Sequence, residues 1–272
     1  MTGVDLVTGV EPGELYDLAA TVGTRAAAWV RERRPSGRVE VAGHKSSATD
    51  PVTALDRGCE ELIRTEILSG RPHDSFMGEE GDDIAGDSGV RWIVDPIDGT
   101  VNFVYGIGSW AVSIAAQAGD VTVAGFIIDG VRNIAWGAIA GQGAWRSDDP
   151  GRRLSADGVR DLSHALVGTG FHYQRHIREH QAGAVAAMLP HIRDIRRLGS
   201  AALDICAVAD GTLDAFVEQG LQPWDLAAGE LIALESGAAV SGLHGPADER
   251  LVMVVTPGLE RDFFELINVC GF

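Results

Sequence analysis

The stretch Trp92-Ile93-Val94-Asp95-Pro96-Ile97-Asp98-Gly99-Thr100-Val101-Asn102-Phe103 couples an apolar run to two aspartates and a glycine turn. The apolar residues predict a strand that leads into Asp95. Pro96 is expected to end the hydrogen-bond ladder of this strand, because proline has no N–H to donate. On a continuous strand Asp95 and Asp98 would face opposite sides of the sheet. A turn at Pro96 brings both carboxylates to one side.

The residues that follow this turn are suited to binding an anion. Gly99 lets a ligand approach the backbone closely. A helix that begins near Thr100 leaves free N–H groups in its first turn, and these favour an anion. The carbonyl oxygen of Ile97 can point to the same side as the two aspartates and add a third hard oxygen.

Other acidic residues stand at the ends of predicted elements. Glu79 and Glu80 follow a short strand, Asp225 opens a helix, and Asp56 has the spacing of a capping box with Thr53. Taken singly, each is best interpreted as a cap or a turn residue. As a converging set they need cations, because two like charges ~4 Å apart repel by about 4 kcal/mol at an effective dielectric constant of 20. Carboxylates with a backbone carbonyl are ligands that Mg²⁺ prefers.

Apolar periodicity and turn residues predict two differently organised halves. The first half reads as helices at 12–34 and 53–69, followed by strands at 75–78, 90–95, 109–118, 121–129 and 134–139, which suggests an antiparallel meander. After a boundary at 147–151, strands at 165–169, 192–196, 213–217 and 251–255 alternate with helices at 174–189, 200–209, 224–236 and 258–269. We therefore expect two parts, residues 1–147 and 148–272, that share one cleft, with helices layered against both sheets.

The composition limits the class of partner. The 272 residues carry 22 basic and 39 acidic side chains, a net charge of −17, which repels DNA, RNA and anionic lipid. A phosphate site must then be locally positive, most simply through bound metal. Three separated cysteines without a Cys-x-x-Cys pair favour a reducing cytoplasm. We expect neither a signal peptide, because Asp5, Glu11 and Glu14 follow no basic leader, nor a transmembrane helix.

Taken together, the motifs resemble the inositol monophosphatase family, in the superfamily of Mg²⁺-dependent, lithium-sensitive sugar phosphatases. The resemblance covers nearly the whole chain, and Arg196-Arg197 is similar to bacterial members. It implies an α/β fold layered α-β-α-β-α, with an antiparallel N-terminal sheet and a smaller C-terminal α/β sheet. The matching residues are Lys45-Ser46-Ser47, Asp50-x-Val52-Thr53-x-x-Asp56, Gly78-Glu79-Glu80, the stretch 92–103, Gly199-Ser200-Ala201-Ala202-Leu203-Asp204, Glu218 and Pro223-Trp224-Asp225.

The resemblance also implies a site with two to three Mg²⁺ ions. One ion would be held by Glu79, Asp95 and the Ile97 carbonyl, a second by Asp95, Asp98 and Asp225, and a third, weaker one near Glu79. The phosphate would rest on the amides of Gly99 and Thr100, and Asp98 and Asp225 would also bind the substrate. Thr100, hydrogen-bonded to Asp56, would act with Glu79 on the attacking water. The alcohol would contact Gly199, Ser200, Ala201 and Glu218, with Lys45, Glu80 and Arg197 nearby.

The activity implied is hydrolysis of a small phosphate monoester by direct attack of water, with myo-inositol monophosphate as the first substrate and a homodimer as the assembly. Histidinol phosphate and fructose-1,6-bisphosphate are alternatives within the superfamily. Glu218 suits either a polyol, whose hydroxyl groups donate to a carboxylate, or a cationic amine. A non-enzymatic regulatory or binding module on the same fold is the alternative of another class, and the retained acidic residues favour catalysis.

One motif competes with this interpretation. His172, His176 and His180 have i, i+4, i+8 spacing on a predicted helix, and residues 176–180 match the H-x-x-E-H pattern of a class of zinc peptidases. Arg175 and Arg178 would oppose a metal ion there. We expect a solvated basic helix face instead.

Overall fold

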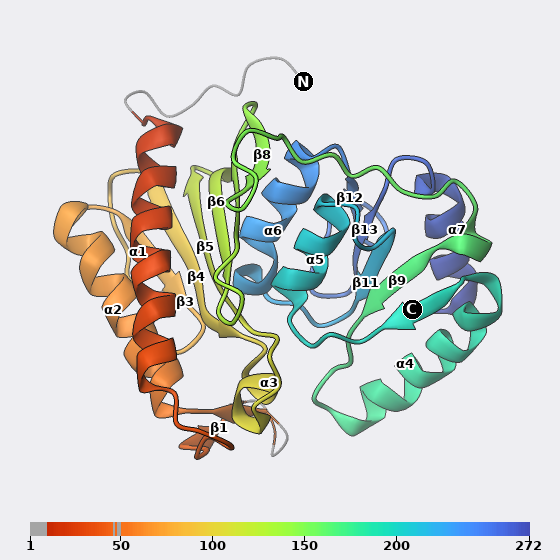
Figure 1. The fold of residues 1–272 in the computed structure, drawn as a ribbon, viewed down its shortest axis with the longest axis horizontal. Coiled ribbons are helices and arrows are strands. Elements are labelled where there is room, and N and C mark those ends of the chain that lie inside the picture. The colour runs from red at the N-terminus through yellow and green to blue at the C-terminus, as the bar shows by residue number, and fades with distance from the viewer. Residues whose placement is uncertain (1–9, 46, 48–49) are drawn as a thin grey trace.

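A computed structural model describes residues 10–45, 47 and 50–272 of the chain (Figure 1). Asp5, which was used in predicting that there is no signal peptide, and Ser46, which is part of the family resemblance, lie outside the described residues. Short 3₁₀ turns occupy Leu162–His164 and Leu189–His191. The α-helices are α1 (Pro12–Arg33), α2 (Ala54–Gly70), α3 (Thr100–Tyr105), α4 (Arg175–Met188), α5 (Ala201–Ala209), α6 (Pro223–Glu235) and α7 (Glu260–Cys270).

The larger sheet has the strand order β3 (Ser75–Gly78), β4 (Val90–Asp98), β5 (Ala111–Ala118), β6 (Val121–Asp129), β7 (Ala135–Ile139) and β8 (Gly143–Arg146). The predicted meander is confirmed from β4 to β7, but β3 pairs with β4 in parallel, so a fully antiparallel sheet was wrong. The connection between these strands runs back along the sheet edge. Phe76 and Ile84 exchange two backbone hydrogen bonds there, so β4 starts at the same end as β3.

The strand β4 continues through Pro96, contrary to the predicted end of the ladder. Asp95 faces Ser113 of β5, whereas Asp98 faces Ala111, so β4 carries one extra residue in this interval. Such a bulge bends the strand and redirects its side chains. The bulge therefore replaces the expected turn.

The smaller sheet has the order β10 (Asp194–Arg196), β9 (Leu166–Thr169), β11 (Ala215–Glu218), β13 (Val252–Val255) and β12 (Ala239–Ser241). β10, β9 and β11 are parallel, and β13 is antiparallel to both of its neighbours. The predicted alternation of strands and helices is confirmed, whereas β12 was not predicted. A further short ladder joins β1 (Gly43–His44) to β2 (Pro51–Val52).

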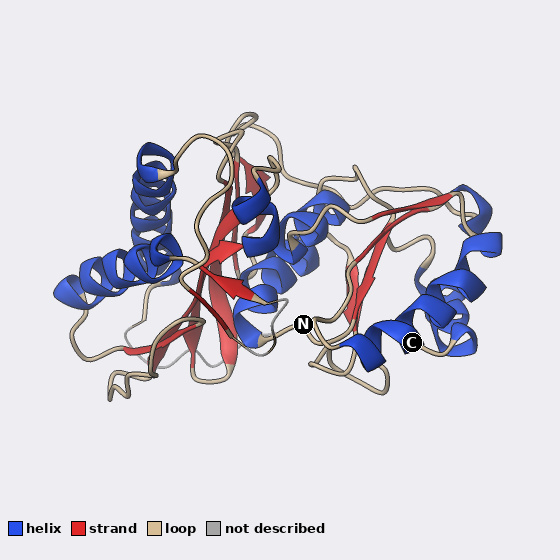
Figure 2. Ribbon diagram, turned by 90° about the horizontal axis from the view of Figure 1, so that it is seen from below, coloured by secondary structure: helices blue, strands red, loops and turns tan. Residues whose placement is uncertain are grey.

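Helices and sheets alternate in five layers (Figures 1 and 2). α1 and α2 cover the outer face of the larger sheet, α5 and α6 lie between the two sheets, and α4 and α7 cover the smaller sheet. All of α5 is buried, because it has a sheet on each side, which explains its nearly continuous apolar sequence. The predicted α-β-α-β-α sandwich is thus confirmed.

The middle helices tie the two halves of the chain together. Ile93 and Ile127 of the larger sheet pack in one buried cluster with Leu203 of α5 and Ile232 of α6. The division into residues 1–147 and 148–272 stays a prediction. Among the described helices, none is both long enough and apolar enough to cross a membrane.

Candidate active site

A cavity of about 380 Å³ is lined by segments from both halves of the chain. The larger sheet supplies the end of β4 and the start of α3. The smaller sheet supplies the segments after β9 and β11, which are parallel neighbours and therefore end at the same edge. Twelve of the predicted site residues line the cavity: Lys45, Glu79, Asp95, Ile97, Asp98, Gly99, Thr100, Arg197, Gly199, Ala201, Glu218 and Asp225. Asp56, Glu80 and Ser200 are not part of its wall.

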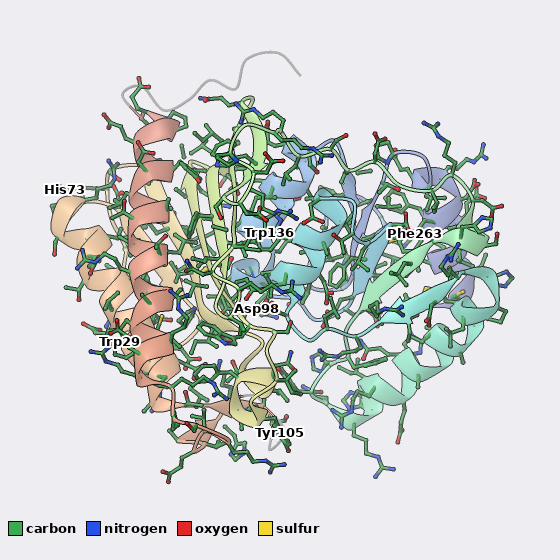
Figure 3. All side chains as sticks on the ribbon, in the orientation of Figure 1. Trp29, His73, Asp98, Tyr105, Trp136 and Phe263 are labelled. Atoms are coloured by element: carbon green, nitrogen blue, oxygen red, sulfur yellow. The ribbon has the colours of Figure 1, made fainter. Side chains whose placement is uncertain are left out.

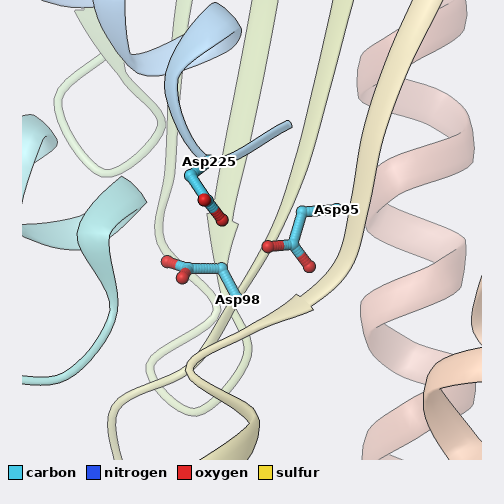
Figure 4. A group of neighbouring side chains, drawn as sticks. All are labelled: Asp95, Asp98 and Asp225. Carbon is cyan, nitrogen blue, oxygen red and sulfur yellow. The ribbon is translucent and has the colours of Figure 1, made fainter. Parts of the chain in front are cut away.

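Three carboxylates meet on the floor of this cavity (Figure 4). Asp95 and Asp98 come from β4, and Asp225 comes from the first turn of α6. One oxygen atom from each lies within 4.8 Å of the other two, and this is the only such His, Cys, Asp or Glu group in the described part of the chain. In Figure 3, Asp98 lies at the junction between the halves. The β4 bulge and the α6 N-terminus thus bring together residues that are distant in sequence.

Backbone and hydroxyl donors hold one oxygen of each carboxylate. Asp95 Oδ1 accepts the Ile97 N–H at 2.9 Å, and Asp225 Oδ2 accepts the Gln222 N–H at 2.7 Å. Asp98 Oδ2 accepts the Ala202 N–H at 2.9 Å and the Ser200 hydroxyl. The orientation of each carboxylate is therefore fixed before any ligand arrives.

The electrostatics of the cluster call for a cation. Burial raises the pKa of Asp95 well above its usual range, and the charges of Glu79, Asp98 and Asp225 raise it further. Burial likewise raises the pKa of Asp225, with Glu79 and Asp98 adding to the effect. Buried carboxylates are stable as anions only when they are paired or coordinate a metal. The donor set, all hard oxygen, fits Mg²⁺.

Glu79 lies on the cavity wall but outside the three-carboxylate group. Its Oε1 lies 2.7 Å from Lys45 Nζ, and the same ammonium also pairs with Glu80. Burial raises the pKa of Glu79 to about 7, although Lys45 acts in the opposite direction. Burial alone would lower the pKa of Lys45, but Glu79 and Glu80 raise it above its ordinary value. The metal role of Glu79 stays a prediction.

Asp56 and Thr100 meet behind the cavity wall. The Thr100 hydroxyl lies 3.2 Å from Asp56 Oδ1 and 3.0 Å from the Ile97 carbonyl oxygen. The capping box at the start of α2 is confirmed, since Asp56 Oδ2 accepts the Thr53 N–H at 2.9 Å. Burial raises the pKa of Asp56, which these hydrogen bonds oppose. Asp56 thus caps one helix with one oxygen and contacts the next with the other.

Gly99 and Gly199 bring the two halves into close approach at the cavity. Both have positive φ, +91° and +93°, where glycine is favoured. A Cβ on Gly99 would lie 2.9 Å from the Gly199 carbonyl oxygen. The Asn102 amide donates to the Leu198 carbonyl at 2.7 Å and secures this junction. The phosphate role of the Gly99 and Thr100 amides stays a prediction.

The far side of the cavity is acidic. Burial raises the pKa of Glu218 to about 7, and the charge of Arg197 acts in the opposite direction. Behind it, burial and the charge of Glu218 raise the pKa of Asp204 to about 8. Asp204 is 1% exposed, and its Oδ1 has no hydrogen-bond partner among the described residues. A substrate with hydroxyl or amine donors suits this wall.

The histidine motif does not form a metal site in the described structure. His172 lines the main cavity, and all three histidines line a neighbouring one of about 540 Å³. Glu179 pairs instead with Arg175, at 2.9 Å. The three histidines form no cluster at metal-binding distances among the described residues.

Several residues of the cavity wall were not predicted from the sequence. Phe171, Tyr173 and Gln174 follow β9, and Gln219 follows β11. The signal that could have found them is the position after two parallel strands, where sheet edges bind ligands. Sequence alone did not establish that these two strands are neighbours.

The comparisons with known proteins support the class of phosphoric monoester hydrolases, with which the layered fold and the acidic cavity agree. It belongs to the inositol monophosphatase family, whose model matches residues 11–263. It is 48% identical over 274 residues to inositol-1-monophosphatase SuhB of Mycobacterium tuberculosis, covering 95% of this chain and 94% of that protein.

A solved structure and a further relative are similar to the chain over most of its length. A solved structure of Mycobacterium tuberculosis SuhB superposes with a TM-score of 0.82 at 43% identity, covering 96% of this chain and 98% of that one. The Nus factor SuhB of Escherichia coli is 35% identical over 223 residues, covering 81% of this chain and 82% of that protein.

Proposed function

We propose that the chain is a Mg²⁺-dependent phosphatase that hydrolyses a small phosphate monoester by direct attack of water. The leading candidate substrate is myo-inositol monophosphate. The observation that carries the proposal is the convergence of Asp95, Asp98 and Asp225 beside the start of α3. Bound Mg²⁺ would neutralise phosphate charge and lower the pKa of water. Its ligands would be these three carboxylates, Glu79 and the Ile97 carbonyl.

The residues of the chain supply positioning and proton transfer. The Gly99 and Thr100 amides hold the phosphate, and the paired Thr100 and Asp56 orient the attacking water and take up its proton. Glu79 acts together with Thr100 and Asp56 on the attacking water. Because one oxygen of each floor aspartate is already held by the protein, little reorganisation is needed when the substrate binds.

The opposite wall selects the alcohol. Glu218 accepts hydroxyl hydrogen bonds, while Gly199 and Ala201 form the adjacent surface and the buried Ser200 lies behind it. A polyol satisfies several acceptors at once, which favours inositol monophosphate. Histidinol phosphate is the alternative that the carboxyl group of Glu218 supports, and fructose-1,6-bisphosphate is a third candidate.

The test is phosphate release with Mg²⁺ from inositol-1-phosphate, histidinol phosphate and fructose-1,6-bisphosphate. We expect inositol-1-phosphate to have the highest kcat/KM. Asp95→Asn should lower turnover by at least about 10²-fold at an unchanged fold, as expected for loss of a group that stabilises transition-state charge. Full activity of Asp95→Asn, judged beside an unaltered circular dichroism spectrum, would refute the metal role.

Lithium inhibition, a homodimer and a cytoplasmic location belong to the same proposal, and light scattering tests the dimer.

A second, regulatory role is supported by one observation, the naming of the Escherichia coli relative as a Nus factor. The high negative charge argues against direct contact with nucleic acid. A filter-binding assay with RNA, expected to be negative, checks this point.

A further inference from the structure

α2 presents three polar groups to three separate segments of the site. Asp56 contacts Thr100, and the Cys59 thiol donates to the Pro96 carbonyl at 3.4 Å. Glu60 Oε2 accepts the Glu80 N–H at 2.7 Å. Asp56 and Glu60 are four residues apart and therefore lie on one face of the helix. The contacts of Asp56 and Cys59 hold α3 and β4, respectively. The contact of Glu60 instead reaches the Glu79-Glu80 turn, and its role is considered next.

Glu60 is an acidic residue in a buried place. It is 3% exposed, although it belongs to a helix that is otherwise amphipathic. It does not line the cavity, so it has no direct contact with a substrate there. Burying a carboxylate is costly unless donors compensate it. Hydrogen bonds from the backbone of Glu80 and Gly81 stabilise the charged form and oppose the rise of the Glu60 pKa that burial causes.

The turn that carries Glu79 is shaped around the Glu60 carboxylate. A Cβ on Gly78 would lie 2.4 Å from Glu60 Oε2, and a Cβ on Gly81 would lie 2.8 Å from Glu60 Oε1. The glycines on both sides of Glu79-Glu80 therefore leave the room that the carboxylate occupies. On the opposite side, Lys45 pairs with both glutamates of the turn.

We infer that Glu60 is a positioning residue for the Mg²⁺ site, because it fixes the backbone of the Glu79-Glu80 turn and so directs the Glu79 carboxylate toward the cavity. The inference rests on the proposed metal role of Glu79. Groups that orient metal ligands by hydrogen bonds alter metal affinity by about 10- to 100-fold when they are removed. Losing Glu60 should therefore weaken Mg²⁺ binding while the ligands themselves remain.

The experiment measures Mg²⁺ binding by isothermal titration without substrate, in the wild type, Glu60→Ala and Glu60→Gln. We expect a loss of affinity of about 10- to 100-fold for Glu60→Ala. The loss should be smaller for Glu60→Gln, whose amide oxygen can still accept the Glu80 N–H. At saturating Mg²⁺, kcat of both variants should return close to the wild-type value, because no group that touches the substrate has changed.

Ile67→Ala is the matched control, since Ile67 is fully buried on the same helix, about 10 Å further along its axis than Glu60. It should lower the melting temperature and leave Mg²⁺ affinity unchanged. If Glu60→Ala fails to fold, Gly81→Ala takes its place, because its Cβ displaces the Glu60 carboxylate, and the same loss of affinity is expected.

Wild-type affinity in a folded Glu60→Ala or Gly81→Ala, or an equal loss in Ile67→Ala, overturns the inference. Absence of Mg²⁺ binding by the wild type contradicts the proposed function itself. The two failures are therefore distinguishable.

Discussion

The Thr100 hydroxyl and the Asp56 carboxylate lie 3.2 Å apart, so the first turn of α3 is connected to the first turn of α2. Both side chains are buried. The contact joins two segments that the sequence separates by β3 and β4. It places a hydroxyl beside a carboxylate that can receive its proton, directly behind the cavity floor.

Replacing Thr100 by Val removes this hydroxyl at nearly constant volume. We expect kcat to fall by about 10²-fold or more, as is typical when a proton-transfer group is lost. Thr100→Ser keeps the hydroxyl and should stay within about 10-fold of the wild type. Steady-state kinetics at saturating Mg²⁺ is the measurement. Equal kcat for the Val and Ser variants would contradict a role for the hydroxyl.

Gly170→Ala tests the position of Glu218. A Cβ at this residue would lie 2.0–2.1 Å from the Glu218 carboxyl group, so Glu218 must move. Losing a hydrogen bond to a charged group costs about 1.5–3 kcal/mol, so KM for inositol-1-phosphate should rise at least about 10-fold with little change in kcat. Gly183→Ala is the control, because a Cβ there meets nothing within 4 Å. An unchanged KM in Gly170→Ala would place Glu218 outside the substrate site.

Asp204 makes stability depend on pH. Its pKa is about 8 in the folded protein, against about 4 for an unfolded aspartate. Between these values the folded chain keeps a proton that the unfolded chain releases, so the favourable contribution is complete below about pH 4 and is lost as pH rises to 8. In EDTA, the free energy of unfolding by urea should therefore fall less steeply from about pH 5 to about pH 8 for Asp204→Asn than for the wild type. Equal slopes would show that Asp204 does not carry this proton.

Mg²⁺ should stabilise the folded chain, because it relieves repulsion among buried carboxylates. At about 100 times its dissociation constant, a ligand of the folded state adds about 2.7 kcal/mol. For a chain of this size that raises the melting temperature by roughly 5–10 °C. Differential scanning calorimetry with and without Mg²⁺ measures the shift, and Asp225→Asn should reduce it. An unchanged wild-type melting temperature counts against the metal site.

Local signals predicted much of this fold. The capping box of Thr53 and Asp56 correctly started α2, and turn residues separated the strands from β4 to β7. The parallel pairing of β3 escaped prediction, because it depends on the route of a loop rather than on strand periodicity. Pro96 was expected to end a ladder, and the bulge that accommodates it depends on the partner strand β5.

The sequence predicted those site residues that belong to a recognisable motif. It did not predict those whose position depends on tertiary packing. The Asp95 and Asp98 carboxylates stood in one motif, whereas their approach to Asp225 was implied only by the family resemblance, because residue spacing alone does not show it. Glu60 looks from the sequence like an ordinary helical glutamate. Only the fold shows that two glycines of a distant turn enclose its carboxylate.

The most direct test of the central claim is a crystal structure of the chain soaked in Mn²⁺, with anomalous difference density measured at the cavity floor. We expect at least two peaks, ~3.5–4 Å apart, one beside Glu79 and Asp95 and one among Asp95, Asp98 and Asp225. Density for a bound ion elsewhere, with none between these three carboxylates, would contradict it.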